Sequence, residues 1–150
     1  LDTPVSYPTQ KVVNVSTRGL VGKDDAALIA GFIISGNAPK KVLLRAVGGQ
    51  TLATLAALPT SAVLSDPVLT LRRRQSDGST IVVRENDDWE SGNDAALVSA
   101  AGDKSGAFPI PSGSKDSAML ISLPPGTYTA VVSGNGGGTG VAIVEVYEVP

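Results

Sequence analysis

Apolar and polar residues alternate along most of the chain, and this pattern predicts β-strands. The last segment shows it clearly, with Val141, Ile143 and Tyr147 on one face of an extended chain and Val144 and Val146 on the other. Successive side chains of a strand point to opposite faces, so alternation of this kind favours a packed strand. Strands are predicted at residues 11–17, 26–35, 40–47, 68–75, 80–84, 116–123, 127–133 and 141–149.

Glycine- and proline-rich turns separate the predicted strands. The chain has 17 glycines and 10 prolines among its 150 residues, and Asp77-Gly78 is a typical hairpin signal. Residues 51–58 repeat leucines at helical spacing, and an alanine-rich piece at 94–101 is expected to form a short helix capped by Asp94. Together these features predict an all-β protein: a single β-sandwich, jelly-roll or immunoglobulin-like, of about eight strands with one or two short helical insertions.

The first ten residues are predicted to form an extended arm outside the sandwich. Pro4 and Pro8 disfavour a helix there and favour a polyproline or edge-strand conformation. The predicted organisation is therefore an N-terminal arm over residues 1–10 and a β-sandwich domain over residues 11–150. The run at 26–35 is apolar enough to predict a buried strand.

The chain contains no histidine and no cysteine, which removes most of the usual site chemistry. Serine–histidine and cysteine–histidine nucleophiles, disulfides, zinc ribbons and iron–sulfur clusters all need one of these two residues. Carboxylate chemistry, a serine–lysine pair and metals bound by oxygen remain. The composition thus favours a binding or structural role over an enzyme.

The charge pattern excludes further partners. Twelve basic and fourteen acidic side chains give a net charge of −2, which provides no electrostatic footprint for nucleic acid. Arg72, Arg73 and Arg74 adjoin, but successive strand residues face opposite sides, so we interpret them as a solvated strand face or as protection of a sheet edge. No stretch approaches the roughly 20 apolar residues that a membrane-spanning helix needs.

One segment concentrates oxygen-bearing side chains, at Asn86, Asp87 and Asp88. Calcium takes six to eight oxygen ligands from carboxylates, amides and carbonyls, so Ca²⁺ is the ion expected there. The spacing is not that of an EF-hand loop, and a solvated turn that caps its own backbone is the alternative. Asp66 and Asp116, each at the start of a strand, could join such a site at the same end of the sandwich.

Three other motifs carry weaker signals. Trp89 is the only tryptophan; it is either a ligand-binding platform or ordinary core packing. The glycine-rich stretch at 134–140 lacks the ending of a phosphate loop and is predicted to be a flexible turn. Ser112 and Lys115 have the spacing of a serine–lysine catalytic pair but stand among glycine and proline before a strand, not at the start of a helix.

The second half of the chain resembles the bacterial pre-peptidase C-terminal domain. The resemblance rests on DPVLTL at 66–71, DGS at 77–79, NDDW at 86–89 and PGTYTAVVSG at 125–134. The first half, through NVSTRG at 14–19, LIAGF at 28–32 and VLLRAVG at 42–48, is similar to a β-sandwich module of large bacterial cell-surface and secreted proteins. The resemblance implies a secreted or cell-surface, non-catalytic accessory domain whose relatives bind calcium or extracellular polymers, with Asn86, Asp87 and Asp88 at the matching positions.

Two functional hypotheses follow. In the first, the chain is a structural protein whose arm adds as a strand to a neighbour's sheet, through Val5, Tyr7, Val13 and Val15. Such a head-to-tail contact need not close, so it can propagate as a surface fibre; a linker within a longer protein is the alternative interpretation of the arm. In the second, the chain is a calcium-assisted accessory module that binds polysaccharide or protein as part of a larger secreted protein.

Overall fold

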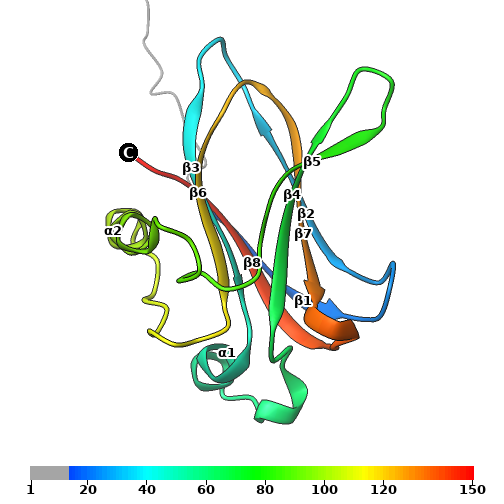
Figure 1. Cartoon of the computed structure of the whole chain (residues 1–150), viewed down its shortest axis with the longest axis vertical. Helices are drawn as coiled ribbons and strands as arrows, with labels where there is room; N and C mark the ends of the chain where they lie inside the picture. The colour runs from blue at the N-terminus through cyan, green and yellow to red at the C-terminus, as the bar shows by residue number, and fades with distance from the viewer. Residues whose placement is uncertain (1–13) are drawn as a thin grey trace, which may run out of the picture.

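The computed structural model describes residues 14–150 (Figure 1). The predicted arm, with Val5 and Tyr7, lies outside the described residues, and so does Val13. In the part of the chain that is described, no helix is both long enough and apolar enough to cross a membrane.

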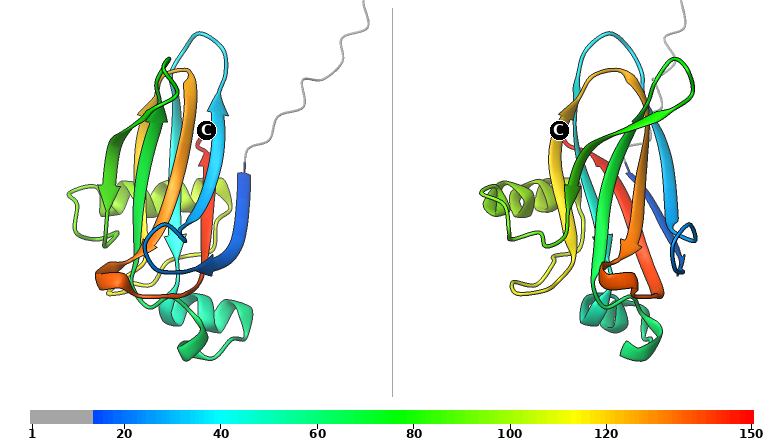
Figure 2. Two further views of the ribbon diagram at one scale, coloured as in Figure 1. Left: turned by 90° about the vertical axis from the view of Figure 1, so that its right-hand side faces the viewer. Right: turned by 45° about the vertical axis from the view of Figure 1, so that its right-hand side comes forward.

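Eight strands form two four-stranded antiparallel sheets that pack face to face (Figures 1 and 2). Sheet A has the strand order β1-β8-β3-β6, and sheet B has the order β2-β7-β4-β5. This arrangement confirms the predicted all-β sandwich. The strands are β1 (Asn14–Val21), β2 (Leu28–Ile34), β3 (Lys40–Val47), β4 (Pro67–Arg74), β5 (Thr80–Asn86), β6 (Ser117–Leu123), β7 (Gly126–Gly134) and β8 (Gly140–Glu148).

The main core lies between the sheets and consists of the inward residues of the alternating strands. In β4, Leu69 and Leu71 are fully buried, and in β7 the inward side chains include Tyr128 and Ala130. Tyr128 satisfies its hydroxyl by donating to the Pro124 carbonyl at 2.6 Å. Burial of each large apolar side chain contributes about 1.5–3 kcal/mol, so this layer accounts for much of the stability of the sandwich.

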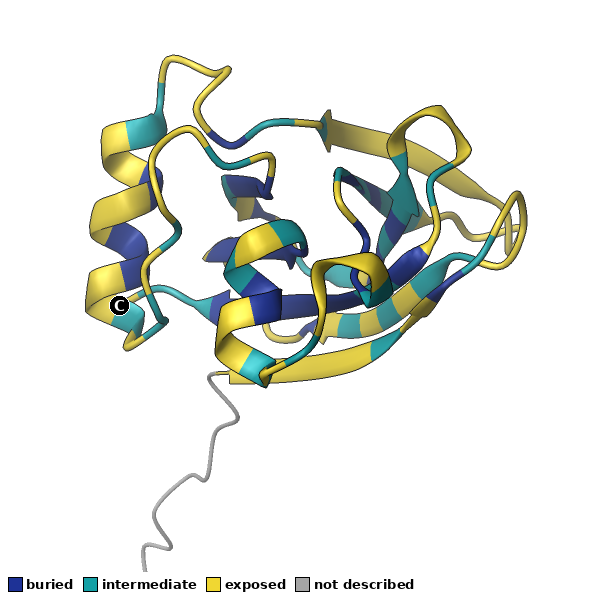
Figure 3. Ribbon diagram, turned by 90° about the horizontal axis from the view of Figure 1, so that it is seen from below, coloured by how far each residue is buried: buried dark blue, intermediate teal, exposed yellow. Residues whose placement is uncertain are grey.

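One end of the sandwich is closed by α1 (Gly49–Ala56), which is followed by the 3-10 turn η1 (Thr60–Ala62). Leu52 and Ala53 of α1 pack on Val47 and Ile143, below the main core. Seen from this end, the helix buries only the side that faces the strands (Figure 3). The helical spacing of residues 51–58 therefore predicted a real helix.

A second helix, α2 (Ala95–Ser105), lies against the outer side of sheet A (Figure 2). Val98 and Ala101 contact Leu43 of β3 in a separate apolar cluster. Asp94 occupies the N-cap position as predicted, but its side chain makes no capping hydrogen bond. Its backbone, at φ −114° and ψ 13°, is not in the extended conformation that aims a capping oxygen at the first helical amides.

The first strand is longer than predicted. Gly19 does not end it; the residue pairs with Ala142 of β8, and the strand continues to Val21. A side chain at Gly19 would place its Cβ 2.7 Å from Leu28 Cδ1. The glycine thus allows β2 to approach β1 and does not act as a strand breaker.

The three adjoining arginines do not protect an edge, because β4 lies between β7 and β5. Arg72 donates from Nε to Thr80 Oγ1 at 2.9 Å, and Arg73 donates from Nη2 to the Pro125 carbonyl at 3.2 Å. Two of the three guanidinium groups therefore have partners within or beside their own sheet, and the third is exposed.

Candidate functional site

Strand pairing in sheet B brings three carboxylates together at one corner of the sandwich. Asp66 directly precedes β4, whereas Asp87 and Asp88 directly follow β5, its antiparallel neighbour. Antiparallel pairing places the start of one strand beside the end of the other. One carboxylate oxygen of each residue lies within 4.8 Å of the other two, and we call these three residues the acidic cluster.

Two further side chains contact the acidic cluster. Asn135 donates from Nδ2 to Asp66 Oδ2 at 3.1 Å and to Asp87 Oδ2 at 3.3 Å, and Lys115 Nζ lies 3.6 Å from Asp66 Oδ2. Asn135 belongs to the stretch predicted to be a flexible turn. The structure instead places it in the 3-10 turn η2 (Asn135–Gly137), with its backbone N–H bonded to the Asp66 carbonyl at 2.9 Å.

The carboxylates repel one another. Desolvation raises the pKa of Asp87 above its usual value, and the negative charges of Asp66 and Asp88 raise it further, while Lys115 acts in the opposite direction. Asp66 Oδ1 is buried and has no hydrogen-bond partner among the described residues. A bound cation would offset the repulsion and provide a partner for that oxygen.

Asn86 lies outside the acidic cluster, although it was predicted to be a metal ligand. Its Oδ1 accepts the backbone N–H of Ala118 at 3.1 Å, and its Nδ2 donates to the Asp88 carbonyl at 3.1 Å. Because its side-chain oxygen accepts an N–H of β6 and its amide donates to the Asp88 carbonyl, Asn86 braces the loop that carries the carboxylates. The role of Asn86 as a metal ligand stays a prediction, and Asp66, which the sequence offered only as a possible addition, is the third carboxylate of the cluster.

Trp89 packs in the apolar cluster under α2 and is only 8% exposed. Its Nε1 donates to the Pro111 carbonyl at 3.3 Å. A ring buried in this way cannot serve as an exposed platform for a ligand. The structure therefore supports the core-packing alternative for this residue.

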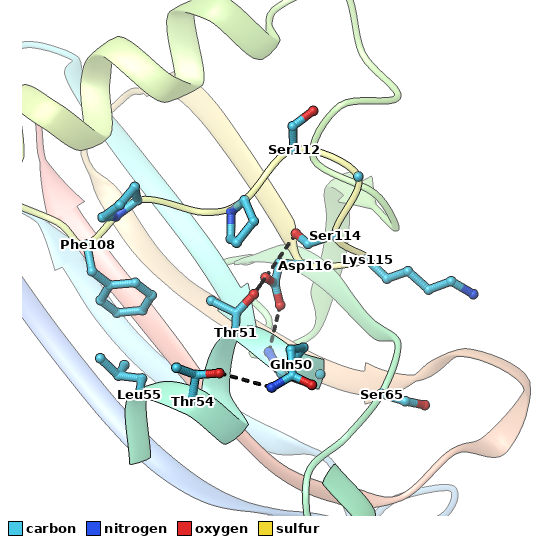
Figure 4. A pocket seen from close by; sticks show the side chains of 15 residues that line it. Gln50, Thr51, Thr54, Leu55, Ser65, Phe108, Ser112, Ser114, Lys115 and Asp116 are labelled. Carbon is cyan, nitrogen blue, oxygen red and sulfur yellow. Dashed lines mark hydrogen bonds between the residues drawn. The ribbon is translucent and has the colours of Figure 1, made fainter. Parts of the chain in front are cut away.

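Asp116 is the fourth carboxylate considered from the sequence, and it belongs to a different feature. It is buried, accepts the Gly48 N–H at 2.8 Å through Oδ1, and accepts the hydroxyls of Thr51 and Ser114 at 2.6 and 3.0 Å through Oδ2. These donors come from the start of α1 and from the loop before β6. Between these two elements lies a cleft of about 610 Å³ (Figure 4).

Ser112 and Lys115 do not form a catalytic pair. Ser112 Oγ donates to Glu90 Oε2 at 3.0 Å, whereas Lys115 Nζ is directed to Asp66. The two side chains point in different directions at the rim of the cleft (Figure 4). The spacing of a serine–lysine motif is therefore coincidental here.

The sheet edges differ in how well they are protected. The outer edge of β6 is occupied by side chains from β5, because Asn86 accepts the Ala118 N–H and Arg84 Nη1 donates to the Leu120 carbonyl at 3.2 Å. The edge strand β5 is interrupted by a register shift that leaves Val83 unpaired. Blocking side chains and bulges are two established ways to prevent pairing with another chain.

The edge strand β2 has no such protection. Its seven residues carry no charge and no proline, and they pair with β7 in one continuous register. On its outer face Ile29 is 57% exposed and Ile33 is 73% exposed. The apolar run that predicted a buried strand is therefore an edge strand, because β7 is its one neighbour among the described strands, and its outer face has no covering layer in the described part of the chain.

Val15, predicted to take part in assembly, lies on the same open side of the sandwich. It pairs with Val146 of β8, whose side chain belongs to the main core, so Val15 also points toward the space between the sheets. It is nonetheless 45% exposed. The β1 and β2 side of the sandwich is thus where inward-facing and outward-facing apolar side chains both reach solvent.

No protein family model matches the chain, and no curated protein matches it. A crystal structure of a protein from Sulfurospirillum deleyianum is similar at 8% identity, over 89% of this chain and 97% of that chain, with a TM-score of 0.36. A likeness this weak carries no conclusion about function. The resemblance to the pre-peptidase C-terminal domain stays a prediction.

Proposed function

We propose that the chain is a non-catalytic structural protein, secreted or displayed on the cell surface, whose copies assemble by strand addition. The N-terminal arm of one copy pairs with β2 of the next. The observation that carries the proposal is the unprotected apolar edge of β2, with Ile29 and Ile33 exposed beside it. An edge strand that lacks charge, proline and bulge is a template for another strand.

The sequence of the arm fits this role. Val5 and Tyr7 occupy odd positions, so in a strand they share one face, while Pro4 and Pro8 occupy even positions. In a strand, the N–H and C=O groups of alternate residues point to the same edge. The odd residues can therefore form backbone hydrogen bonds with β2, while the two prolines, which have no N–H to donate, lie on the edge that faces away from β2. Ten residues span about 33 Å in extended form and a seven-residue strand about 23 Å, so the arm is long enough.

The contact joins two different surfaces, the arm and the β2 edge. Each copy carries one arm and one β2 edge, so the contact is heterologous. A chain of such contacts stays open unless the rotation between successive copies closes it into a ring. Linear polymers are the expected product.

Deletion of residues 1–10 is expected to abolish assembly, because the donor strand is lost. The double variant Ile29→Lys with Ile33→Lys is expected to do the same, because lysines on an edge strand oppose pairing. Both isoleucines are largely exposed, so these substitutions leave the fold intact. Particle mass by light scattering, with negative-stain microscopy, measures the outcome, and Ile81→Lys on β5 is the matched control that still assembles.

Mixing the two non-assembling proteins gives the sharpest result. The deleted chain retains its β2 edge and the double-lysine variant retains its arm, so together they should form a one-to-one complex that grows no further. Unaltered polymers from the deleted chain would overturn the proposal. A wild-type chain that is monomeric at every concentration would overturn it too, and would point to an arm that folds back on its own sheet.

The acidic cluster favours a second candidate, a calcium-assisted binding module. Calcium–oxygen distances of about 2.3–2.6 Å place ligand oxygens up to about 5 Å apart across the ion, and one carboxylate oxygen of each residue of the acidic cluster lies within 4.8 Å of the other two. Rotation of the Asn135 amide would present Oδ1 in place of Nδ2 and add a neutral oxygen. The buried Asp66 Oδ1 would gain most from a bound cation, because it has no hydrogen-bond partner among the described residues.

Calcium at about 10 mM is expected to raise the melting temperature by about 3–10 °C, if its affinity is that of other extracellular modules. The double variant Asp87→Ala with Asp88→Ala should lose this gain, and it should melt no lower than wild type without calcium because a repulsion has been removed. Asp103→Ala, on α2, is the control. Equal calcium responses in all three proteins would eliminate this candidate.

A further inference from the structure

The cleft between α1 and the loop before β6 has the size of a small-molecule site. Its volume of about 610 Å³ falls within the range of about 300–1,000 Å³ that such sites occupy. One wall is the first two turns of α1, and the other is the segment from Phe108 to Asp116 (Figure 4). None of the functions considered so far uses this cleft.

Both walls are held in place from below. Asp116, at the floor, accepts hydrogen bonds from Gly48 and Thr51 on the α1 side and from Ser114 on the loop side. Its carboxylate therefore ties one wall to the other. A ligand would meet a preformed site and would not have to order two loops when it binds.

The loop wall is anchored a second time, by Arg45 of sheet A. Its Nη1 donates to the Phe108 carbonyl at 2.6 Å, and its guanidinium carbon lies 4.3 Å from the centre of the Phe108 ring. Arg45 covers one face of the Phe108 ring and holds the ring in place. The other face and the edge of the ring can therefore line the cleft. In Figure 4 the ring extends toward Leu55 of α1.

Apart from Lys115 and Asp116, the lining is neutral and of two kinds. Apolar surface comes from Leu55, which is 53% exposed, and from Phe108 with two prolines of the same loop. Polar groups are a carboxamide and hydroxyls, which both donate and accept hydrogen bonds. These groups belong to Gln50, Thr51, Thr54, Ser65, Ser112 and Ser114.

The two charged residues of the cleft are already occupied. Both oxygens of Asp116 accept hydrogen bonds from the protein, and Lys115 is directed toward Asp66. An anionic ligand would have to compete with Asp66 for Lys115, and a cationic ligand would have to displace the donors that Asp116 already has. Gln50 donates from Nε2 to Thr54 Oγ1, so the Gln50 carboxamide oxygen and the Thr54 hydroxyl proton remain for a ligand. A purely apolar ligand would cover these two polar groups without giving them a partner, which is unfavourable.

We infer that the cleft binds a neutral saccharide. Sugar hydroxyls donate and accept as the lining hydroxyls and the Gln50 amide do, and the apolar C–H faces of a sugar ring can pack on Phe108, Leu55 and the prolines. The inference does not depend on assembly through the arm. For the second candidate function, the binding module, it names neutral polysaccharide as the polymer that is bound.

Isothermal titration of the full chain tests the inference with five neutral hexasaccharides, built from β-1,4-glucose, α-1,4-glucose, β-1,4-xylose, β-1,4-mannose and β-1,4-N-acetylglucosamine. At least one should bind with millimolar affinity or better, and an oligogalacturonate of similar length should bind more weakly. The double variant Gln50→Ala with Thr54→Ala should weaken binding at least about tenfold. Both residues are exposed, so the fold is retained.

Ile81→Thr on β5 is the control, with unchanged affinity expected. No binding of any neutral hexasaccharide at about 10 mM, where a millimolar site would be nearly saturated, would overturn the inference. Unchanged affinity in the double variant would also overturn it, because the sugar would then bind elsewhere. Particle mass reports on assembly independently, so failure of one proposal is distinguishable from failure of the other.

Discussion

Replacing Arg45 with methionine is expected to destabilise the protein by about 3–5 kcal/mol. Arg45 of β3 forms an ion pair with Glu145 of β8, in which Nη2 lies 3.0 Å from Oε1. Each of the two residues is only 2% exposed. The Tyr147 hydroxyl donates to the other carboxylate oxygen, and burial together with Glu145 raises the pKa of Tyr147. Without Arg45, a buried carboxylate would have no counter-charge.

Urea unfolding measures this loss, and a second ion pair provides the control. Lys40 lies 3.5 Å from Glu148, with side chains 35% and 22% exposed, so Lys40→Met should cost less than about 1 kcal/mol. Adding Glu145→Met to Arg45→Met should recover part of the loss, because the isolated charge is removed. If Arg45→Met costs no more than Lys40→Met, the pair is not the structural element described here.

Gly140→Ala is expected to cost about 4 kcal/mol, from overpacking and backbone strain together. Gly140 begins β8 at φ +147°, and an added Cβ would lie 2.4 Å from both Leu64 N and Val63 C. Those backbone atoms cannot move aside easily, since Leu64 N donates to the Val141 carbonyl at 2.8 Å. The substitution should therefore separate the Val63–Leu64 segment from the first residues of β8.

Gly136→Ala is the matched control for this prediction. Gly136 also has a positive φ, +62°, but an added Cβ would meet nothing within 4 Å. Its cost should be only that of a left-handed non-glycine residue, about 1–2 kcal/mol. Melting curves of the two variants separate the contributions, and equal losses would show that the clash at Gly140 relaxes.

The strands could be predicted because each one faces the common core with alternate residues. The boundaries of β3 and the paired residues of the Asp77-Gly78 hairpin follow directly from that alternation and from turn chemistry. The order of strands in each sheet could not be predicted, since alternation indicates which face is buried and not which strand is the neighbour. For the same reason the sequence did not show that Ile29 and Ile33 belong to an edge.

The candidate site was predicted in part. Asp87 and Asp88 were found because they adjoin in the sequence, and Asp66 was considered because it starts a strand. Asn135 was missed because glycine on its C-terminal side suggested flexibility, although Asn135 is ordered by the Asp66 backbone. Its position beside Asp66 depends on the pairing of β4 with β7, which no local pattern reveals.

The cleft and the buried ion pair could not have been found from the sequence. The two cleft walls are separated by more than fifty residues, and their meeting depends on Asp116. Arg45 and Glu145 occupy the outer face of sheet A, where charged residues normally contact water. The segment between β5 and β6 covers that face, and its irregular sequence showed only the short helix within it.

The pairing of β1 with β8 has a consequence for the order of folding. Sheet A joins the first and last strands of the described chain, with β8 between β1 and β3. Until β8 is present, β1 lacks the strand with which it pairs in sheet A, and β3 can pair only with β6. The sheet therefore cannot form progressively from the N-terminus. Pairing across such sequence distances is slow, on the order of milliseconds to seconds. The sandwich should therefore fold late and as a unit, once the last strand is available.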